Sequence, residues 1–76
     1  MDLIKHKNYF ISISRQGNDI DGNGIYLINV FKKINNDYLR NINIELNQKT
    51  DKYNNIRKKG YKDIIVQSLK KDINKL

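Results

Sequence analysis

The residues best suited to binding a metal ion lie in one short segment, Asp19-Ile20-Asp21-Gly22-Asn23-Gly24. Its carboxylate and amide oxygens at alternating positions, with a glycine at the sixth, match the first half of an EF-hand calcium loop. Such a loop needs a bidentate carboxylate at position twelve, which is Val30 here. The same residues suit the turn of a hairpin, so the sequence predicts a Gly-rich loop between two strands and no metal site.

Groups that could catalyse a reaction are sparse. His6 is the only histidine and the chain has no cysteine, which excludes disulfides and zinc sites built on thiolates. Ser12 and Ser14 could act as nucleophiles only beside an oriented base, and no obvious partner is present. The carboxylates are scattered and suggest no pair for acid–base work. We therefore predict a protein that is not an enzyme and uses no cofactor.

Positive charge is the feature that indicates a partner. The formal net charge is +7, and residues 49–76 hold nine Lys or Arg against three Asp, whereas residues 1–48 hold six against five acids. A basic segment on a nearly neutral body favours an anionic partner, most often nucleic-acid phosphate. The opposing interpretation is compositional: Ile, Asn and Lys make up 37 of the 76 residues, as A+T-rich coding would produce.

The densest basic cluster is residues 57–62, Arg-Lys-Lys-Gly-Tyr-Lys, in which the tyrosine could stack on a base. Further lysines follow near the C-terminus, and two arginines lie on expected strands. The predicted nucleic-acid-binding set, whose basic members would contact phosphates, is Arg15, Arg40, Arg57, Lys58, Lys59, Tyr61, Lys62, Lys70 and Lys71.

Three segments have the apolar–polar pattern of β-strands. Residues 8–15 and 38–48 alternate, whereas residues 25–33 are apolar on both faces and suit a central strand. The connectors 16–24 and 34–37 carry the Gly, Asn and Asp typical of turns. These features predict a three-stranded antiparallel meander.

From about residue 51 to 75 the apolar residues recur at helical spacing. The stripe that contains Tyr53 points away from the stripe that contains Leu69, so one straight helix cannot bury both against a sheet. Gly60 follows three cations, as a residue that ends a helix often does. We predict a C-terminal helix that is kinked or broken near Gly60.

The second face of this predicted sheet would mix aromatic and small polar side chains. Such a mixture is typical of surfaces that stack on unpaired bases and of protein interfaces, although Asn is also favoured by the composition. The residues of this face that we take as a candidate protein interface are Phe10, Phe31, Asn41 and Asn43.

The sequence thus predicts one small α+β domain over residues 1–76, in which a three-stranded antiparallel β-meander precedes a C-terminal helix. No apolar stretch is long enough for a secretory signal or a membrane span, so we expect a cytoplasmic protein without a membrane partner. The sequence does not decide whether the protein forms a homodimer or which sheet face packs on the helix.

Two functions fit these features. The first is a non-enzymatic module that binds DNA or RNA and contacts phosphates through the basic C-terminal helical segment. The second is a phage or mobile-element inhibitor, for example an anti-CRISPR protein, that binds a host nucleoprotein complex. Small size and the absence of a recognisable catalytic group suit both, and the choice between DNA and RNA is open.

Overall fold

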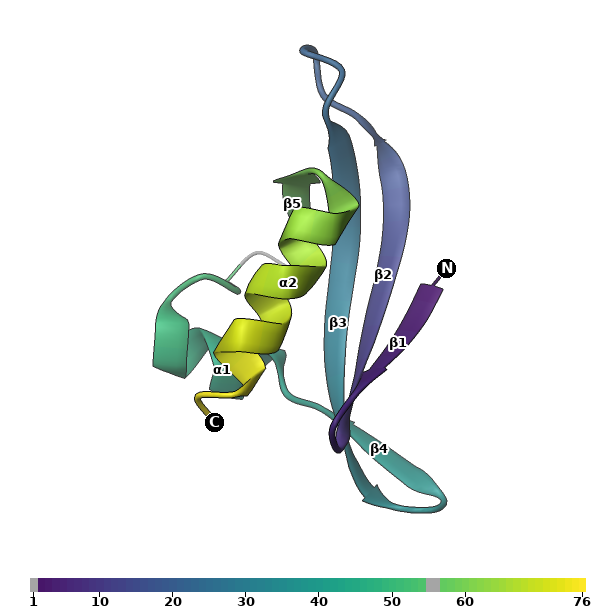
Figure 1. Ribbon diagram of the computed structural model, residues 1–76, viewed down its shortest axis with the longest axis vertical. Coiled ribbons are helices and arrows are strands. Elements are labelled where there is room, and N and C mark those ends of the chain that lie inside the picture. The colour runs from purple at the N-terminus through teal and green to yellow at the C-terminus, as the bar shows by residue number, and fades with distance from the viewer. Residues whose placement is uncertain (1, 55–56) are drawn as a thin grey trace.

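The computed structural model describes residues 2–54 and 57–76 and shows an α+β fold (Figure 1). An antiparallel sheet of four consecutive strands and a fifth strand is combined with two helices, the second of which ends near the C-terminus. The elements in chain order are β1 (Asp2–His6), β2 (Tyr9–Asn18), β3 (Gly24–Asn35), β4 (Tyr38–Asn41), α1 (Asn43–Thr50), β5 (Arg57–Gly60) and α2 (Lys62–Ile73).

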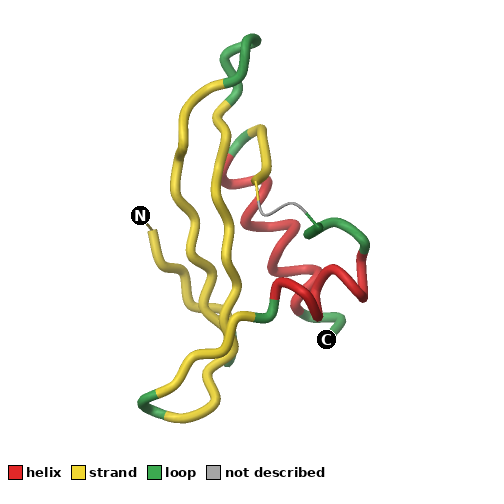
Figure 2. Tube along the Cα trace, turned by 180° about the vertical axis from the view of Figure 1, so that it is seen from behind, coloured by secondary structure: helices red, strands yellow, loops and turns green. Residues whose placement is uncertain are grey.

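Strand β3 is the centre of the sheet. One of its edges pairs with β2 over nearly its whole length, and β1 continues the sheet beyond β2. Its other edge is shared, because β5 pairs with Gly24–Leu27 and β4 pairs with Phe31–Asn35. The β2–β3 hairpin projects beyond the helices at its tip (Figure 2), and the molecule is 41 Å long. The prediction that residues 25–33 form the central strand is confirmed.

The core lies between the sheet and the two helices, which pack on the same side of it (Figure 1). Alternate residues of β2 and β3 point toward the helices, as the period of a strand requires. From the helical side, α2 contributes a stripe at spacings of three and four residues. The buried hydrophobic residues are Ile11, Ile13, Ile28, Val30, Ile42, Leu46, Tyr53, Val66, Leu69 and Ile73.

The predicted third strand is too long. Only Tyr38–Asn41 is a strand, and the following residues form α1 instead. The alternation of residues 42, 44 and 46 misled the prediction because Ile42 and Leu46 also stand four apart, as neighbours on one helical face do. Both are buried, whereas Ile44 between them is 74 % exposed. The true period is therefore that of a helix.

The predicted helix over residues 51–75 is also wrong for the described residues of its first half, and residues 55–56 of that prediction lie outside the described part of the chain. Asp51 adopts a left-handed φ of 57° and ends α1, and Arg57–Gly60 is an extended strand that completes the edge of β3. Gly60 has a φ of 132°, a conformation that side chains rarely adopt, and it lies at the junction of β5 and α2. The break was placed correctly, but it separates a strand from a helix.

The edge of β3 has a gap between β5 and β4, and the side chain of Asn43 fills it. Its Oδ1 accepts a hydrogen bond from the Val30 N–H at 2.8 Å, and its Nδ2 donates to the Ile28 carbonyl oxygen at 3.2 Å. The amide thus replaces one peptide group of a missing strand. We expected Asn43 on the second face of the sheet, but it is buried at the start of α1. The prediction that Asn43 belongs to a protein interface on that face is therefore wrong.

Candidate functional site

The loop resembling a calcium site is held together by its own hydrogen bonds. Asp19 Oδ1 accepts from the N–H groups of Asp21 and Asn23 at 3.0 and 2.8 Å, and Oδ2 accepts from Asn23 Nδ2 at 3.2 Å. Burial alone would raise the pKa of the Asp19 carboxyl, but these hydrogen bonds and the Lys59 ammonium lower it. The acceptors that a cation would need therefore stabilise the hairpin turn between β2 and β3.

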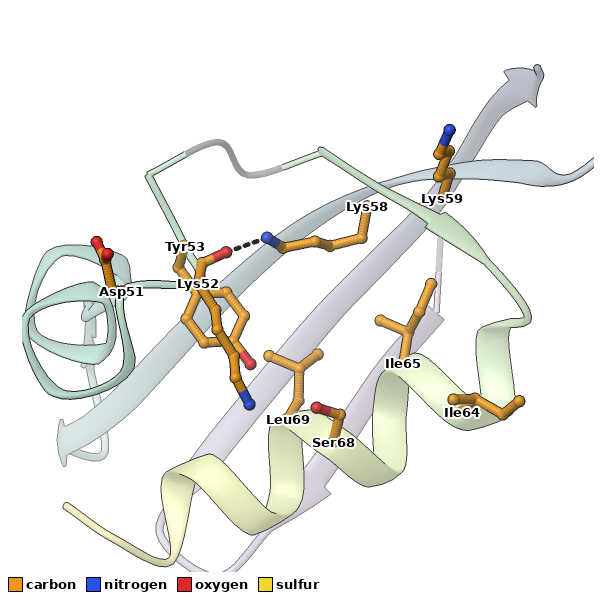
Figure 3. A pocket seen from close by; sticks show the side chains of 9 residues that line it. All are labelled: Asp51, Lys52, Tyr53, Lys58, Lys59, Ile64, Ile65, Ser68 and Leu69. Carbon is orange, nitrogen blue, oxygen red and sulfur yellow. Dashed lines mark hydrogen bonds between the residues drawn. The ribbon is translucent and has the colours of Figure 1, made fainter. Parts of the chain in front are cut away.

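A cleft of about 480 Å³ opens between the segment after α1, strand β5 and helix α2 (Figure 3). Tyr53 and Leu69 form its floor, and Lys58 crosses it. The Lys58 ammonium lies 5.1 Å from the centre of the Tyr53 ring and donates to the Lys52 carbonyl oxygen. Of the three lysines that line this cleft, Lys58 is thus already engaged by the protein.

Behind the cleft is a buried polar network centred on Asp72, which is only 1 % exposed. The Tyr53 hydroxyl donates to its Oδ2 at 2.6 Å, and the ammonium groups of Lys52 and Lys75 lie 3.4 and 3.8 Å from its oxygens. Burial and the Asp72 carboxylate raise the pKa of Tyr53, so its hydroxyl stays protonated. The network ties the segment after α1 to α2, which is a structural role.

His6, the single histidine of the sequence, has a contact that links two elements of the fold. His6 Nε2 lies 2.9 Å from Asn74 Oδ1, which joins the end of β1 to the end of α2. Ser68 lines the cleft, but no group of three or more His, Cys, Asp or Glu that could hold a metal ion occurs in the described ranges. The absence of catalysis remains a prediction.

The nine predicted nucleic-acid-binding residues do not form one surface. Arg40 pairs with Glu45 of α1 at 2.8 Å, Arg15 donates to Asn18, and Lys58 points into the cleft. Lys62, Lys70 and Lys71 belong to α2, on the helical side, and Tyr61 precedes that helix and is 73 % exposed. Arg57 and Lys59 occupy strand positions that alternate with Lys58 and belong to the other face of the sheet, although Lys59 also borders the cleft.

The side of the sheet away from the helices is a second candidate surface, which we call the open face. Its positions follow from the register, because they alternate with the core residues of each strand. They are Leu3, Lys5, Phe10, Ser12, Ser14, Ile25, Leu27, Asn29, Phe31, Lys33, Leu39, Asn41, Arg57 and Lys59. Four of these described positions are Lys or Arg and none is Asp or Glu. One of the four, Lys59, has its ammonium 4.0 Å from the Asp19 carboxylate of the hairpin turn.

Aromatic and amide side chains meet in the middle of the open face. Phe10 and Phe31 stand directly opposite each other on β2 and β3, and Asn41 of β4 is the next residue in the same row. Asn41 Nδ2 donates to Asn29 Oδ1 at 3.1 Å. The predicted interface residues Phe10, Phe31 and Asn41 therefore do share a surface.

Sequence reasoning missed several members of this face. Lys5 and Leu3 lie on β1, which was not predicted because a five-residue strand gives little periodic signal. Lys33 of β3 belongs to neither of the predicted site sets. The register could have been inferred from the alternation of the two long strands, which places Phe10, Phe31 and Lys33 on one face.

Comparison with known proteins gives no relative for this chain: no protein-family model, curated protein or solved structure matches it. No helix in the described part of the chain has the length and apolar character needed to cross a membrane. The functional argument therefore depends on the geometry and charge of the surfaces described above.

Proposed function

We propose that this protein binds single-stranded nucleic acid on the open face of its sheet. The observation that carries the proposal is the facing pair Phe10 and Phe31 on a surface whose described positions hold four cations and no carboxylate. Aromatic side chains stack on unpaired bases, and cations around them attract the phosphates. Both interactions are needed for a site that accepts many sequences.

The arrangement favours a single strand over a duplex. Bases in a duplex stack on one another, so their faces are not available to Phe10 and Phe31. The open face is also the broad side of a sheet, whereas reading a duplex groove requires a helix or a two-stranded ribbon that enters it. A single-stranded nucleic acid that crosses β1, β2 and β3 would meet Lys5, which lies opposite Phe10, and Lys33, which lies two residues after Phe31 on β3.

The sequence analysis predicted phosphate contacts on a C-terminal helical segment instead. Two double variants with the same change in net charge test which of the two sites binds the phosphates. Lys5→Gln with Lys33→Gln removes two cations from the open face, and Lys70→Gln with Lys71→Gln removes two from α2. Each pair lowers the formal net charge from +7 to +5. Any difference between them therefore reports position rather than total charge.

The measurement is fluorescence anisotropy with mixed-sequence single-stranded DNA, single-stranded RNA and duplex DNA at about 50 and 200 mM salt. We expect a Kd in the micromolar range or tighter for single strands at the lower salt concentration, and weaker binding at the higher one. The open-face double variant should weaken binding about tenfold and the helix double variant much less. Each lost phosphate contact means that fewer counterions are released on binding, which lowers the affinity. The opposite ranking would assign the phosphates to α2 and overturn the open-face proposal.

A second candidate function uses the same face for a protein partner. Leu3 is 60 % exposed and Leu39 43 % exposed there, and apolar side chains of this size suit the centre of a protein interface. This observation favours the inhibitor of a host nucleoprotein complex. Absence of nucleic-acid binding at about 50 mM salt, together with capture of a defined nucleoprotein that persists at high salt, would favour that function instead.

A further inference from the structure

We propose that Asn29 is a specificity-determining residue of the open face and favours bases with carbonyl oxygens on their edges, namely thymine, uracil, guanine and cytosine, over adenine, which has none. This inference rests on the proposed binding of single strands. It follows from the direction of a chain of hydrogen bonds that begins in the backbone of α1 and ends at the Asn29 side chain.

The first step fixes the orientation of Asn41. Its Oδ1 accepts a hydrogen bond from the backbone N–H of Asn43 at 2.9 Å. A backbone N–H can only donate, so the oxygen of the Asn41 amide must be the atom that faces it. The Nδ2 group of Asn41 is thereby directed toward β3.

The second step fixes Asn29 in turn. Asn41 Nδ2 donates to Asn29 Oδ1 at 3.1 Å, so the Asn29 oxygen faces β4 and its Nδ2 group faces away. This side chain is partly exposed. Asn29 therefore turns its amide nitrogen away from β4, toward the part of the open face that Ser12 of β2 borders.

The third step places these donors beside the aromatic pair. Asn29 and Phe31 are two residues apart on β3 and so share one face, and Phe10 lies across from Phe31. Diagonal neighbours of this kind are about 7–8 Å apart, within reach of a base that stacks on either ring. The edge of such a base would lie over Asn29 while its plane lies against a phenylalanine.

Donors at this position select among the bases by their edges. Thymine and uracil carry two carbonyl oxygens and guanine carries O6 beside N7, all of which accept hydrogen bonds. Cytosine offers O2 in the same way. Adenine has no carbonyl oxygen and offers only ring nitrogens as acceptors, and its N6 amino group would meet the N–H groups of Asn29 in place of an acceptor. The amide is also held in place by α1, so little freedom is lost when a base binds.

The test compares the affinities for oligo(dT) and oligo(dA) of equal length, measured by anisotropy at about 50 mM salt. Three proteins are used: the wild type, Asn29→Asp and Ser14→Asp. The aspartate at position 29 keeps an acceptor for Asn41 but replaces the two outward donors with an acceptor. Ser14→Asp adds the same charge to the same face and leaves the Asn29 amide intact. Ser14 lies on β2, two residues from Ser12, which stands opposite Asn29.

We expect the wild type to prefer oligo(dT) about tenfold, as one good polar contact to a base edge allows. Asn29→Asp should reduce the preference about tenfold, and Ser14→Asp should weaken both affinities by the same factor and leave their ratio unchanged. A ratio that Asn29→Asp leaves at the wild-type value, with both variants folded by circular dichroism, overturns the role of Asn29 alone. No binding of either oligonucleotide by the wild type overturns the proposed function together with this inference.

Discussion

The two faces of the sheet are built from the same strands but have opposite properties. On the covered face, Ile11, Ile13, Ile28 and Val30 are at most 2 % exposed and pack under two helices. The open face alternates with these residues and combines partly exposed apolar side chains with amides and four cations. The period of a strand therefore divides one element, β3, between a stabilising surface and a candidate binding surface.

The comparison also explains why the basic cluster of residues 57–62 does not act as one unit. Extended backbone sends Lys58 toward the helices, where it contacts Tyr53, and sends Arg57 and Lys59 to the open side. A helix would have spread the same residues around its circumference instead. Clustering in the sequence is thus a poor guide to clustering in space when the cluster falls on a strand.

The largest expected difference between the faces is in stability. Ile28→Ala removes a core side chain that is 1 % exposed and should lower the free energy of unfolding by about 2–5 kcal/mol. Leu27→Ala, one residue earlier, removes a similar side chain from the open face and should cost about 1 kcal/mol. Urea denaturation of both variants measures the contrast. Equal losses would mean that the open face is packed as tightly as the core.

The next effect concerns two asparagines near the start of α1. Asn43→Ala leaves the Val30 N–H and the Ile28 carbonyl without their side-chain partner, at a cost of about 1–3 kcal/mol for each buried group. Asn41→Ala removes an exposed side chain whose partners can bond to water, so we expect a loss below about 1 kcal/mol. Chemical denaturation and hydrogen exchange at the Val30 amide check both. A milder effect of Asn43→Ala would show that water enters the gap.

A third contrast depends on pH and lies on the covered side alone. Burial and Asp72 raise the pKa of Tyr53 in the folded protein above its value of about 10 in the unfolded chain. The folded protein therefore keeps the hydroxyl proton at pH values where the unfolded chain loses it. The stability that this provides is complete below about pH 10 and is lost as pH rises toward the folded pKa. Above pH 10, the free energy of unfolding should therefore fall more steeply in the wild type than in Tyr53→Phe, by at most about 1.4 kcal/mol per pH unit.

Denaturation curves at several pH values between about 9 and 11 test this slope. Tyr61→Phe is the matched control, because Tyr61 is 73 % exposed and outside the buried network. The control should follow the wild-type curve. If Tyr53→Phe follows it as well, the Tyr53 hydroxyl is not held protonated by Asp72.

The last contrast combines a modest effect on stability with a large effect on binding. Phe10→Leu with Phe31→Leu keeps apolar side chains on the open face but removes both aromatic rings, so we expect about 1–2 kcal/mol of destabilisation. Binding of single strands should weaken at least tenfold, because stacking on an aromatic ring contributes about 1–3 kcal/mol per base. Anisotropy and denaturation on the same samples separate the two. Unchanged affinity would show that the rings do not stack on bases.

Much of the sheet could be predicted because its signals are local. The alternation of residues 8–15, the two-sided apolar pattern of residues 25–33 and the turn residues between them are confirmed as the β2–β3 hairpin. The presence of Phe10, Phe31 and Asn41 on one face follows from the same alternation. The two strands that were not predicted, β1 and β5, have only five and four residues. Segments this short do not show enough alternation to be recognised as strands.

By itself the sequence determined an α+β chain with a central strand, a hairpin and a helical C-terminal segment interrupted near Gly60, because residue period and turn chemistry act over a few neighbouring residues. Only the tertiary structure decided that Arg57–Gly60 joins β3, that Asn43 fills the remaining edge and that both helices cover one face. These features depend on hydrogen-bond partners and apolar neighbours more than a dozen residues away, which the local pattern does not encode. The same long-range pairing leaves Phe10, Phe31 and Asn29 on the uncovered side.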